Sequence, residues 1–537
     1  MQALTDRVYD VAIIGGGILG LSVARDCAMR RLSVVLFERE DFGAGTTGAG
    51  PGILSGEPHW LSTDPETTRI ACEEINVLQR IAPNLLTRVP ILYPVHKSEP
   101  KQDLDRLEAL ADLYDHYAVA KAGLPHVRLT GKDLRTLDPG LTDECWGAIS
   151  MDEWSADPAR LALAIARSAA AAGATLLKPA VVEKVEVQSG KPVGVRVSGL
   201  SDVPLLVRSR AVVNAAGPWG PGFVPKRSVE FRYYQRSYFF LERRLTDVAL
   251  AIPVPRRIDP LYVFPRGGMT LIGASEVPLS GKPEDARVGS EELARTLEAV
   301  KRYFPAIESH RFTSMVTGVH CRVVATAGAE GQRQAVFDHG KEGIEGLYTL
   351  VGGGLTRARR LAEQVTNLVC KQLRQKERCR THLEGLPGCT PEIPWREEAE
   401  RSGRDPVLVA QLIRRHGHKA ASILDAAARQ PELAQTLCEC ENVVAAEAEY
   451  TIRKEWVTSL ADLKRRTRLG EGSCRGARCH FAGACFLGSQ LSWNGERVAE
   501  ELERNPCQFP KELSWGAQRK QEEYAEYLRG FGGKPHA

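Results

Sequence analysis

Four cysteines near the end of the chain are spaced as two close pairs. One pair has the form C-x-C, the other has the form C-x4-C, and residues 441–473 separate them. They are Cys438, Cys440, Cys474 and Cys479. Iron–sulfur clusters use four cysteine thiolates, and zinc also accepts four sulfurs, although its usual pairs are C-x2–4-C. The spacing leaves a 2Fe-2S cluster, a zinc site and free thiols open, whereas Cys485 and Cys507 lie outside the pattern and are expected to pack as small apolar side chains.

A glycine turn near the amino terminus has the second clear chemical pattern. Gly15, Gly17 and Gly20 follow an apolar segment and open a helical one, and Glu38 ends the next apolar run. Gly15 permits the tight turn, Gly17 lets backbone N–H groups approach a pyrophosphate, and Gly20 permits close packing of helix on strand. Glu38 is placed to bind ribose hydroxyls, so the pattern predicts a dinucleotide-binding site.

Further small-residue loops favour FAD over a nicotinamide dinucleotide. A loop over 43–50 follows the first unit, and a late turn at 352–354 opens another helix. Two such turns far apart in sequence suit an extended cofactor held at both ends. We expect these loops, and the strands between them, to supply further residues that contact FAD. They are Arg39, Thr46, Thr47, Val182, Ala216, Gly217, Gly353, Gly354, Leu355 and Thr356.

These residues require strands that end at one edge of a sheet, with helices beginning there. Apolar runs at 8–14 and 33–37 predict strands joined by a helix over 21–30, and the late unit is predicted as a strand over 346–351 and a helix over 356–372. Asp157 is the expected N-cap of an alanine-rich helix that has Pro158 at its first position. Residues 229–275 are rich in strand signals, including a hairpin that turns at 266–268, and predict a sheet that faces the substrate.

Helical periodicity also occurs between the two cysteine pairs. Residues 443–452 and 460–467 have this pattern, with Ser459 as the expected N-cap of the second helix. A basic run over 464–468 closes that helix, where cations complement the helix dipole. This run could form a nucleic-acid-binding patch, which is the more specific interpretation. A solvated helix end is far more common for such a run.

Composition places the chain among ordinary globular proteins. It has 537 residues, of which 43% are hydrophobic and 26% charged, and its net charge of +4 gives no overall footprint for nucleic acid. No stretch reaches the roughly 18 apolar residues that a membrane span needs. The amino terminus has acidic residues ahead of its first apolar run and does not match a secretory signal, so we expect a cytoplasmic location, peripheral to a membrane only through partner subunits.

The chain resembles the D-amino-acid-oxidase-like FAD oxidoreductases in several motifs. They are the glycine turn with Glu38, the Thr46-Thr47-Gly48 loop, the segments 157–160 and 214–219, and the late turn 352–355. Within this group the likeness is strongest to the large subunits of anaerobic glycerol-3-phosphate dehydrogenases, and it extends over nearly the whole chain. The resemblance implies an α/β fold in which a Rossmann-type FAD-binding domain is interleaved with a β-sheet substrate domain. It also implies hydride transfer to flavin from a carbon that bears OH or NH2.

The same resemblance implies a small helical iron–sulfur domain at the end of the chain. The cysteine segment is similar to the bacterioferritin-associated-ferredoxin-like 2Fe-2S domain of those subunits. This likeness carries the ligand role to Cys438, Cys440, Cys474 and Cys479. Because a flavin takes two electrons and such a cluster passes one at a time, we expect an exit path to other electron-transfer subunits or to an acceptor protein.

Departures from the family concern groups that bind the substrate phosphate. The family's Arg-Asn-His-Gly-Leu-Leu-His-Ser-Gly segment, which an Arg follows, corresponds to 49–57, where these His and Arg residues are missing. The Arg of its Gly-Val-Arg-Pro segment is replaced by His320, and the Lys of its Gly-Gly-Lys turn is replaced by Gly354. Charge-assisted hydrogen bonds dominate phosphate recognition, so we expect that glycerol 3-phosphate is not the substrate.

Three residues near the expected flavin face form the predicted catalytic set. His320 is the candidate base because the unperturbed pKa of histidine lies near neutrality. Arg322, or alternatively Arg357, would clamp a substrate carboxylate, and Tyr262 lies on the neighbouring hairpin. A buried structural histidine and arginines that contact the surface or the FAD phosphates are the simpler alternatives.

The sequence therefore predicts an FAD-dependent dehydrogenase for a small polar substrate, namely a hydroxy acid, amino acid or polyol derivative. One alternative is a glycerol-3-phosphate dehydrogenase in which Arg256, Arg257 or Arg322 replaces the missing anchors, and another is an electron-transfer subunit that has lost turnover. The predicted parts are an oxidoreductase over 1–375 with its substrate region mainly at 229–320, a connector and helical region over 376–430, a 2Fe-2S domain over 431–490, and a tail over 491–537. The tail could dock a partner or cover the cluster domain.

Overall fold

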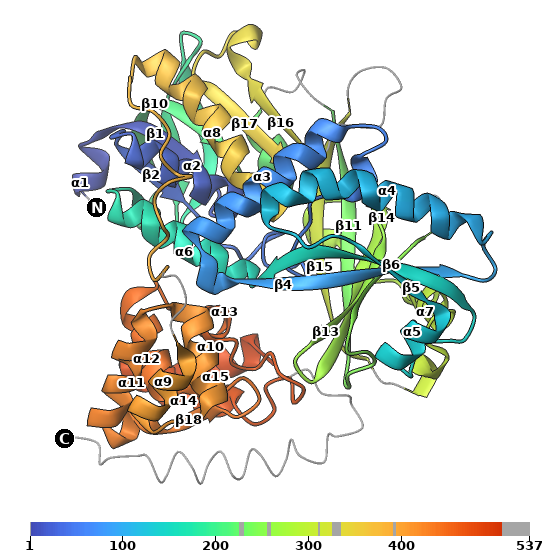
Figure 1. The fold of residues 1–537 in the computed structure, drawn as a ribbon. Helices are drawn as coiled ribbons and strands as arrows, with labels where there is room; N and C mark the ends of the chain where they lie inside the picture. The colour runs from blue at the N-terminus through green and yellow to red at the C-terminus, as the bar shows by residue number, and fades with distance from the viewer. Residues whose placement is uncertain are drawn as a thin grey trace.

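The predicted strand–turn–helix unit forms the centre of a mixed sheet in the computed structural model (Figure 1). The structure describes residues 2–224, 230–254, 259–309, 312–324, 334–389 and 394–506. Within them, the sheet has the order β16-β17-β10-β1-β2-β7, and a β8–β9 hairpin is attached to β10. Its strands are β1 (Val8–Ile14), β2 (Val34–Phe37), β7 (Thr175–Leu177), β8 (Val181–Gln188), β9 (Lys191–Ser198), β10 (Leu205–Asn214), β16 (Gln334–Asp338) and β17 (Leu347–Gly352). β2, β1, β10 and β17 are mutually parallel, which confirms the Rossmann-type arrangement.

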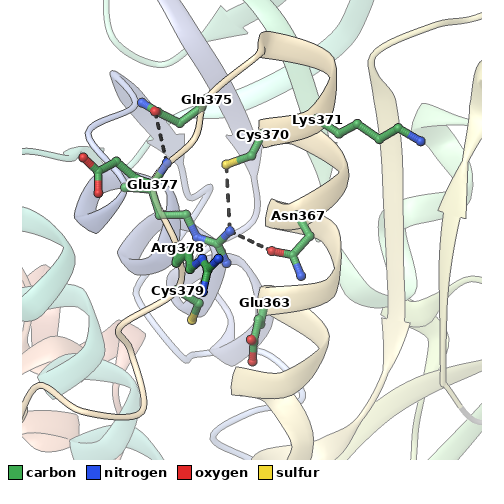
Figure 2. A pocket seen from close by; sticks show the side chains of 9 residues that line it. Glu363, Asn367, Cys370, Lys371, Gln375, Glu377, Arg378 and Cys379 are labelled. Atoms are coloured by element: carbon green, nitrogen blue, oxygen red, sulfur yellow. Dashed lines mark hydrogen bonds between the residues drawn. The ribbon is translucent and has the colours of Figure 1, made fainter.

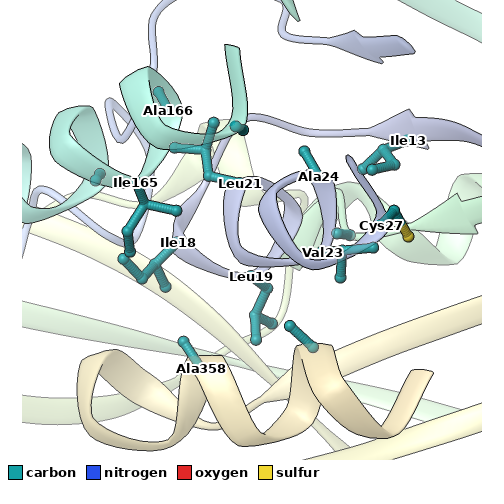
Figure 3. Close-up of a cluster of buried hydrophobic side chains, with 14 of the residues drawn as sticks. Ile13, Ile18, Leu19, Leu21, Val23, Ala24, Cys27, Ile165, Ala166 and Ala358 are labelled. Atoms are coloured by element: carbon teal, nitrogen blue, oxygen red, sulfur yellow. The ribbon is translucent and has the colours of Figure 1, made fainter. Parts of the chain in front are cut away.

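Three helices cover this sheet and share its largest apolar cluster. They are α2 (Ile18–Met29), α6 (Pro158–Ala171) and α8 (Gly354–Leu373). Figure 3 shows Leu19 of α2 facing Ala358 of α8, and Leu21 facing the α6 residues Ile165 and Ala166. α2 begins three residues before the predicted start, because Gly17 in an extended conformation serves as its N-cap and the helix follows the glycine turn directly.

A second, mainly antiparallel sheet forms the interleaved domain. Its order is β15-β11-β14-β13-β12-β4-β6-β3, with β5 paired to β6. The strands are β3 (Ile53–Leu54), β4 (Leu86–His96), β5 (Val127–Thr130), β6 (Cys145–Ala156), β11 (Glu230–Leu241), β12 (Ala249–Ile252), β13 (Leu261–Arg266), β14 (Met269–Leu279) and β15 (Phe312–Val324). The hairpin predicted at 266–268 is β13–β14, and strands from 53–156 extend the sheet beyond the predicted region 229–320.

Helices flank this second sheet. They are α3 (Pro65–Ile81), α4 (Gln102–Ala118), α5 (Gly131–Leu137) and α7 (Ser290–Lys301). A short helix, α1 (Gln2–Thr5), precedes β1. In Figure 1, α3 and α4 lie along one side of β4 and β6. α7 packs against β14.

The C-terminal region is a separate helical domain. It contains α9 (Trp395–Ser402), α10 (Pro406–His416), α11 (Lys419–Arg429), α12 (Ala445–Lys454), α13 (Leu460–Thr467), α14 (His480–Leu491) and α15 (Gly495–Arg504), with β18 (Thr436–Cys438) paired to β19 (Val443–Val444). α9, α10 and α11 share an apolar cluster with the start of α12, so the helical unit includes much of the predicted connector region. No described helix is long and apolar enough to cross a membrane.

Local signals placed several helix starts correctly. The Asp157 side chain accepts hydrogen bonds from the backbone N–H groups of Ala159 and Arg160, and Ser459 caps α13 in the same manner. The predicted helix over 443–452 starts later, at Ala445, because its first two residues pair with β18 instead. Arg256, Arg257, Cys507 and the tail beyond 506 lie outside the described residues.

Candidate active site

The predicted cofactor residues meet at the carboxyl edge of the first sheet. Ile14 lies in register with Phe37 on one side and with Asn214 on the other, and Asn214 lies in register with Thr349 of β17. The residues that follow these strands are therefore neighbours in space. They include Gly15, Glu38, Ala216, Gly217, Gly353 and Gly354. The parallel alignment brings both glycine turns to one edge, as a cofactor held at two points requires.

The first glycine turn leaves no room for side chains. Gly15 has a φ of +101°, and a Cβ built on it would lie 2.6 Å from the carbonyl oxygen of Ala215. A Cβ on Gly20 would overlap the carbonyl oxygen of Gly15. The backbone can thus approach a ligand closely at the amino end of α2, where N–H groups and the helix dipole favour an anion. The turn fits the pyrophosphate of FAD.

Glu38 and Thr47 fix the shape of this turn. Glu38 Oε2 accepts a hydrogen bond from Gly16 N–H at 2.7 Å, and Thr47 Oγ1 accepts one from Ile18 N–H at 3.0 Å. Burial raises the pKa of Glu38, although backbone N–H groups oppose this shift. Arg39 lies with its guanidinium 3.7 Å from the ring centroid of Trp219 and so joins the loop after β2 to the loop after β10. Glu38, Arg39 and Thr47 therefore lie around the same site as the glycine turn.

The late turn closes the same edge from the other side. Gly353 and Gly354 have φ values of +84° and +54°, and Gly353 is the N-cap of α8, so Leu355 and Thr356 lie in its first turn. Asn214 holds the middle loop by donating from Nδ2 to the carbonyl oxygen of Gly220 at 2.9 Å. Val182 lies on the hairpin strand β8, in an apolar cluster with residues of β1 and β2.

Strand β15 brings the predicted catalytic residues to the flavin loops. The Thr46 hydroxyl donates to the carbonyl oxygen of Val319, and a Cβ on Gly318 would lie 2.7 Å from the Cβ of Ala49. Residues at alternate positions of a strand share a face, so His320 and Arg322 lie on the same side of β15 as Gly318. This places His320 next to the strand residues that contact the loop assigned to FAD, with Arg322 further along the same face of β15.

His320 and Arg322 are held together by Tyr234 of β11. The His320 ring is stacked on the Tyr234 ring with centroids 5.6 Å apart, and the Arg322 guanidinium lies 4.1 Å from the same ring centroid. β11 pairs with β15 so that Tyr234 is directly opposite His320. The structure thus brings the two residues together, and their chemical roles stay predictions.

A carboxylate that the sequence analysis did not single out lies at the centre of this group. Glu276 of β14 accepts a hydrogen bond from Arg236 Nε at 2.8 Å and another from Arg322, and its Oε2 lies 3.4 Å from His320 Nε2. Burial opposes ionisation, but Arg236, His320 and Arg322 hold the pKa of Glu276 below its usual value. Arg236 also forms an ion pair with Asp259.

The other predicted side chains have different partners. Tyr262 lies beside Tyr93, and burial raises the pKa of Tyr262 well above the usual range. Arg357 Nη2 lies 3.3 Å from the carboxylate of Glu57, in the segment where this chain lacks the family's Arg. Arg357 Nη1 donates to Thr67. Arg236, Arg322 and Arg357 therefore each have a carboxylate partner at this face.

The four late cysteines form two contacting pairs. The thiol of Cys438 lies beside that of Cys479, and the thiol of Cys440 lies beside that of Cys474. Cys438 and Cys479 are buried, whereas Cys440 and Cys474 are half-buried. Within the described part of the chain, no three His, Cys, Asp or Glu side chains are grouped to hold one metal ion. Four thiols in two pairs are a donor set that a 2Fe-2S cluster or a zinc ion could use, so the predicted cluster stays a prediction.

Comparison with known proteins decides the family. The profile of the FAD dependent oxidoreductase family matches residues 10–368. This chain belongs to that family. The C-terminal domain of alpha-glycerophosphate oxidase matches residues 379–498 of this FAD-dependent oxidoreductase, and this match does not test the predicted iron–sulfur function.

Several relatives of this FAD-dependent oxidoreductase cover nearly its whole length. One subunit of the anaerobic glycerol-3-phosphate dehydrogenase of Escherichia coli K12 is 28% identical over 98% of this chain and 97% of its own. Glycerol-3-phosphate dehydrogenase of Synechocystis is 25% identical over 93% of this chain and 96% of its own. The chain is thus an FAD-dependent oxidoreductase similar to glycerol-3-phosphate dehydrogenases.

Solved structures show the same fold. The glycerol-3-phosphate dehydrogenase from Bacillus halodurans complexed with FAD has a TM-score of 0.73 and 23% identity, covering 94% of this chain and 95% of its own. Glycine oxidase from Bacillus cereus has a TM-score of 0.54 and 22% identity, covering 69% of this chain and 96% of its own. The glycine oxidase likeness therefore extends over about two thirds of the FAD-dependent oxidoreductase.

The C-terminal domain of this FAD-dependent oxidoreductase docks on the FAD-binding domain through buried charges. Asp41, three residues after Glu38, accepts hydrogen bonds from Arg466 Nη2 at 2.8 Å and Arg465 Nε at 2.6 Å. Lys178 lies 2.7 Å from Asp41 and 2.8 Å from Asp462. The basic run over 464–468 is therefore an interdomain contact, and its prediction as a solvated helix end was wrong because its partners come from distant segments.

An open pocket of about 470 Å³ lies elsewhere in this FAD-dependent oxidoreductase. Figure 2 shows Cys370, Asn367 and Lys371 on the last turns of α8, with Arg378 and Cys379 on the segment that follows. The candidate cofactor edge is at the opposite end of α8, roughly 25 Å away at 1.5 Å per residue. The pocket is therefore separate from the predicted active site.

Proposed function

We propose that this chain is the flavin subunit of a dehydrogenase that oxidises a small hydroxyl- or amino-bearing substrate without a phosphate group. The observation that carries the proposal is the juxtaposition of β15 and the flavin loop, which sets His320 beside a cofactor edge built from two glycine turns. FAD bound at this edge would accept hydride from the substrate carbon.

His320 would act as the base that removes the proton from the substrate hydroxyl or ammonium group. Its Nε2 lies 3.4 Å from a carboxylate oxygen of Glu276, which would hold the ring for this role. Stacking on Tyr234 fixes the plane of the imidazole ring. Glu276 then orients the base and stabilises the positive charge that develops on it, while Arg322 completes the polar wall of the site.

Charge pairing supports a substrate without phosphate. A phosphate dianion is recognised by several charge-assisted hydrogen bonds, and these need cations that can turn toward it. Arg236 and Arg322 share Glu276, and Arg357 is paired with Glu57. A hydroxy acid, amino acid or polyol derivative needs at most one such contact, which Arg322 or Arg357 could supply.

A second candidate is glycerol 3-phosphate, and the relatives favour it. Proteins named glycerol-3-phosphate dehydrogenase align with more than nine tenths of this chain. For that substrate, at least one of the paired arginines would have to exchange its carboxylate for the phosphate. A catalytically silent FAD subunit is the third possibility.

Electrons would leave through a 2Fe-2S cluster held by Cys438, Cys440, Cys474 and Cys479. The two contacting thiol pairs support this part of the proposal. The Escherichia coli relative is named as one subunit of its enzyme, in keeping with transfer from this chain to another electron-transfer protein.

Anaerobic bleaching of the bound flavin distinguishes the three functions. We expect a 2-hydroxy acid, a 2-amino acid or an unphosphorylated polyol to reduce the FAD rapidly, and glycerol 3-phosphate to do so poorly. Efficient reduction by micromolar glycerol 3-phosphate would establish the second candidate instead. Reduction by none of these compounds, with FAD still reducible by dithionite, would support the silent subunit.

A further inference from the structure

The cysteine segment contacts the substrate sheet as well as the FAD-binding domain. Arg475 directly follows Cys474, and its guanidinium lies 5.1 Å from the ring centroid of Phe240 on β11. Arg475 is 8% exposed and Phe240 is 5% exposed, so the contact is buried. Arg266, the last residue of β13, lies 6.0 Å from the same centroid. In Figure 1, the red loops of the C-terminal domain extend toward β13.

Phe240 lies on a strand that leads back to the flavin loop. Tyr238 is two residues earlier on β11 and faces the same side, and both side chains belong to one apolar cluster. A Cβ built on Gly50 would lie 4.0 Å from the Tyr238 hydroxyl oxygen. Packed side chains therefore run from the loop over 43–50, through Tyr238 and Phe240, to the residue next to Cys474.

We propose that the contact between Arg475 and Phe240 positions the four cysteines for electron transfer from the flavin. Arg475 is a positioning residue in this account, and the inference rests on the proposed function, which places FAD and a 2Fe-2S cluster in the chain. The packed route between the two sites crosses this contact. Electron-transfer rates fall steeply with distance, so loosening the contact should slow the transfer between the centres.

The electron balance requires an acceptor outside the chain. Two electrons would pass from the substrate carbon to the flavin as a hydride, and the hydroxyl or ammonium proton would go to His320 and then to solvent. The hydrogen carried by the hydride would leave as a proton when the flavin is reoxidised. A 2Fe-2S cluster held by the four cysteines would accept these electrons one at a time. A one-electron acceptor protein then oxidises the cluster, and the second electron follows by the same route.

Arg478 provides a matched control on the same segment. Its side chain is 72% exposed and pairs with Glu439, which is 73% exposed. Arg478→Gln therefore removes a charge near the cysteines without touching Phe240. Arg475→Lys keeps a cation for the Phe240 ring, whereas Arg475→Gln removes it, and Phe240→Leu changes the ring without altering the cysteine segment.

The test follows electron redistribution in the iron-loaded, FAD-loaded protein after flash photoreduction by a deazaflavin radical. We expect Arg475→Gln and Phe240→Leu each to slow the transfer from flavin to cluster severalfold, because losing the buried cation–π contact would let the cysteine segment move away from β11. Arg475→Lys should restore the rate, and Arg478→Gln should leave it unchanged. Iron content and the electron paramagnetic resonance signal of the reduced cluster should match those of the native protein in every variant.

Three results would overturn the inference in different ways. Native transfer rates in both Arg475→Gln and Phe240→Leu, with iron and sulfide present, would show that the route is wrong while the proposed function stands. Absence of iron and sulfide from anaerobically purified native protein would remove the cluster from the proposed function and this inference with it. Loss of iron from Phe240→Leu would assign the contact to cluster retention and also contradict the inference.

Discussion

Glu276 sets the charge of the face that we propose binds substrate. It binds Arg236 and Arg322 and lies beside His320, so one carboxylate contacts three groups from two neighbouring strands. The glycine turns and Glu38 could be predicted because their spacing is local. Glu276 could not, since its partners come together only through the pairing of β11 with β14 and β15.

Replacing the proposed base should slow the chemical step selectively. We expect His320→Gln to lower the rate of anaerobic flavin reduction by the active substrate about 100-fold, because general-base catalysis contributes roughly two to four orders of magnitude. FAD content and thermal stability should stay close to those of the native protein. His96→Gln, at a partly exposed position of β4 where Nδ1 bonds to Ser98, is the control. A native rate in His320→Gln would remove this residue from the mechanism.

Glu38 should decide how tightly FAD is held. Its carboxylate shapes the glycine turn and is placed for the ribose, so Glu38→Gln should weaken FAD binding about tenfold or more, as expected when a charged hydrogen bond is lost. Glu40→Gln, whose side chain is 65% exposed, should bind FAD normally. Equilibrium titration of the apoprotein with FAD gives both dissociation constants. Equal affinity in the two variants would contradict the assignment of Glu38.

Helix α13 shows what local sequence signals miss at the scale of elements. Its boundaries and its cap were predicted correctly, because periodicity and Ser459 specify them. The role of its basic end was not, because the acceptor Asp41 lies more than 400 residues earlier in the sequence. Similarly, residues 443–444 are helical by pattern but form β19 through pairing with β18.

Removing the carboxylate of Asp41 should destabilise the docking of the C-terminal domain. Asp41→Asn leaves the buried Arg466 without its ionic partner, so the free energy of unfolding should fall by about 3 kcal/mol. Glu66→Gln, which breaks an exposed ion pair with Arg69, should leave the free energy of unfolding almost unchanged. Chemical denaturation followed by fluorescence measures both values. Equal stability of the two variants would mean that the network does not hold the domains together.

The same contact should make stability depend on pH in the acid range. Burial opposes ionisation of Asp41, but Arg466, Arg465 and Lys178 hold its pKa well below the usual value. A depressed folded-state pKa contributes stability above the unfolded-state pKa of about 4 and loses it as pH falls. The difference in unfolding free energy between native protein and Asp41→Asn should therefore shrink as pH is lowered below about 4. A difference that stays constant down to about pH 3 would contradict this cause.

The whole molecule brings three parts to one junction. The FAD edge, the substrate sheet and the cysteine segment meet around α6, β11 and β13, with Arg468 binding both Asp157 and Glu441. The division into an oxidoreductase part and a helical C-terminal part was evident from the sequence. The way they pack was not, because the contacts depend on single charged residues with no recurring spacing.

Cysteine substitution tests whether the C-terminal domain holds the proposed 2Fe-2S cluster. Cys474→Ser should lose most of the iron and sulfide, because one of the four proposed ligands is removed. Cys485→Ser, on α14 and outside the two pairs, should retain both elements. FAD content should be unaffected in each variant. Equal metal content in the two variants would exclude Cys474 as a ligand, and zinc in place of iron in the native protein would replace the cluster with a different site.

One measurement addresses the central claim, that a single chain takes electrons from an unphosphorylated substrate at FAD and delivers them to its own cluster. Anaerobic, iron-loaded protein is mixed with a 2-hydroxy acid, 2-amino acid or polyol that bleaches the flavin, and the cluster is followed by electron paramagnetic resonance. The account predicts flavin bleaching followed by the signal of a reduced 2Fe-2S cluster, with a much weaker response to glycerol 3-phosphate. Flavin bleaching by glycerol 3-phosphate alone, or bleaching without any cluster signal, would contradict it.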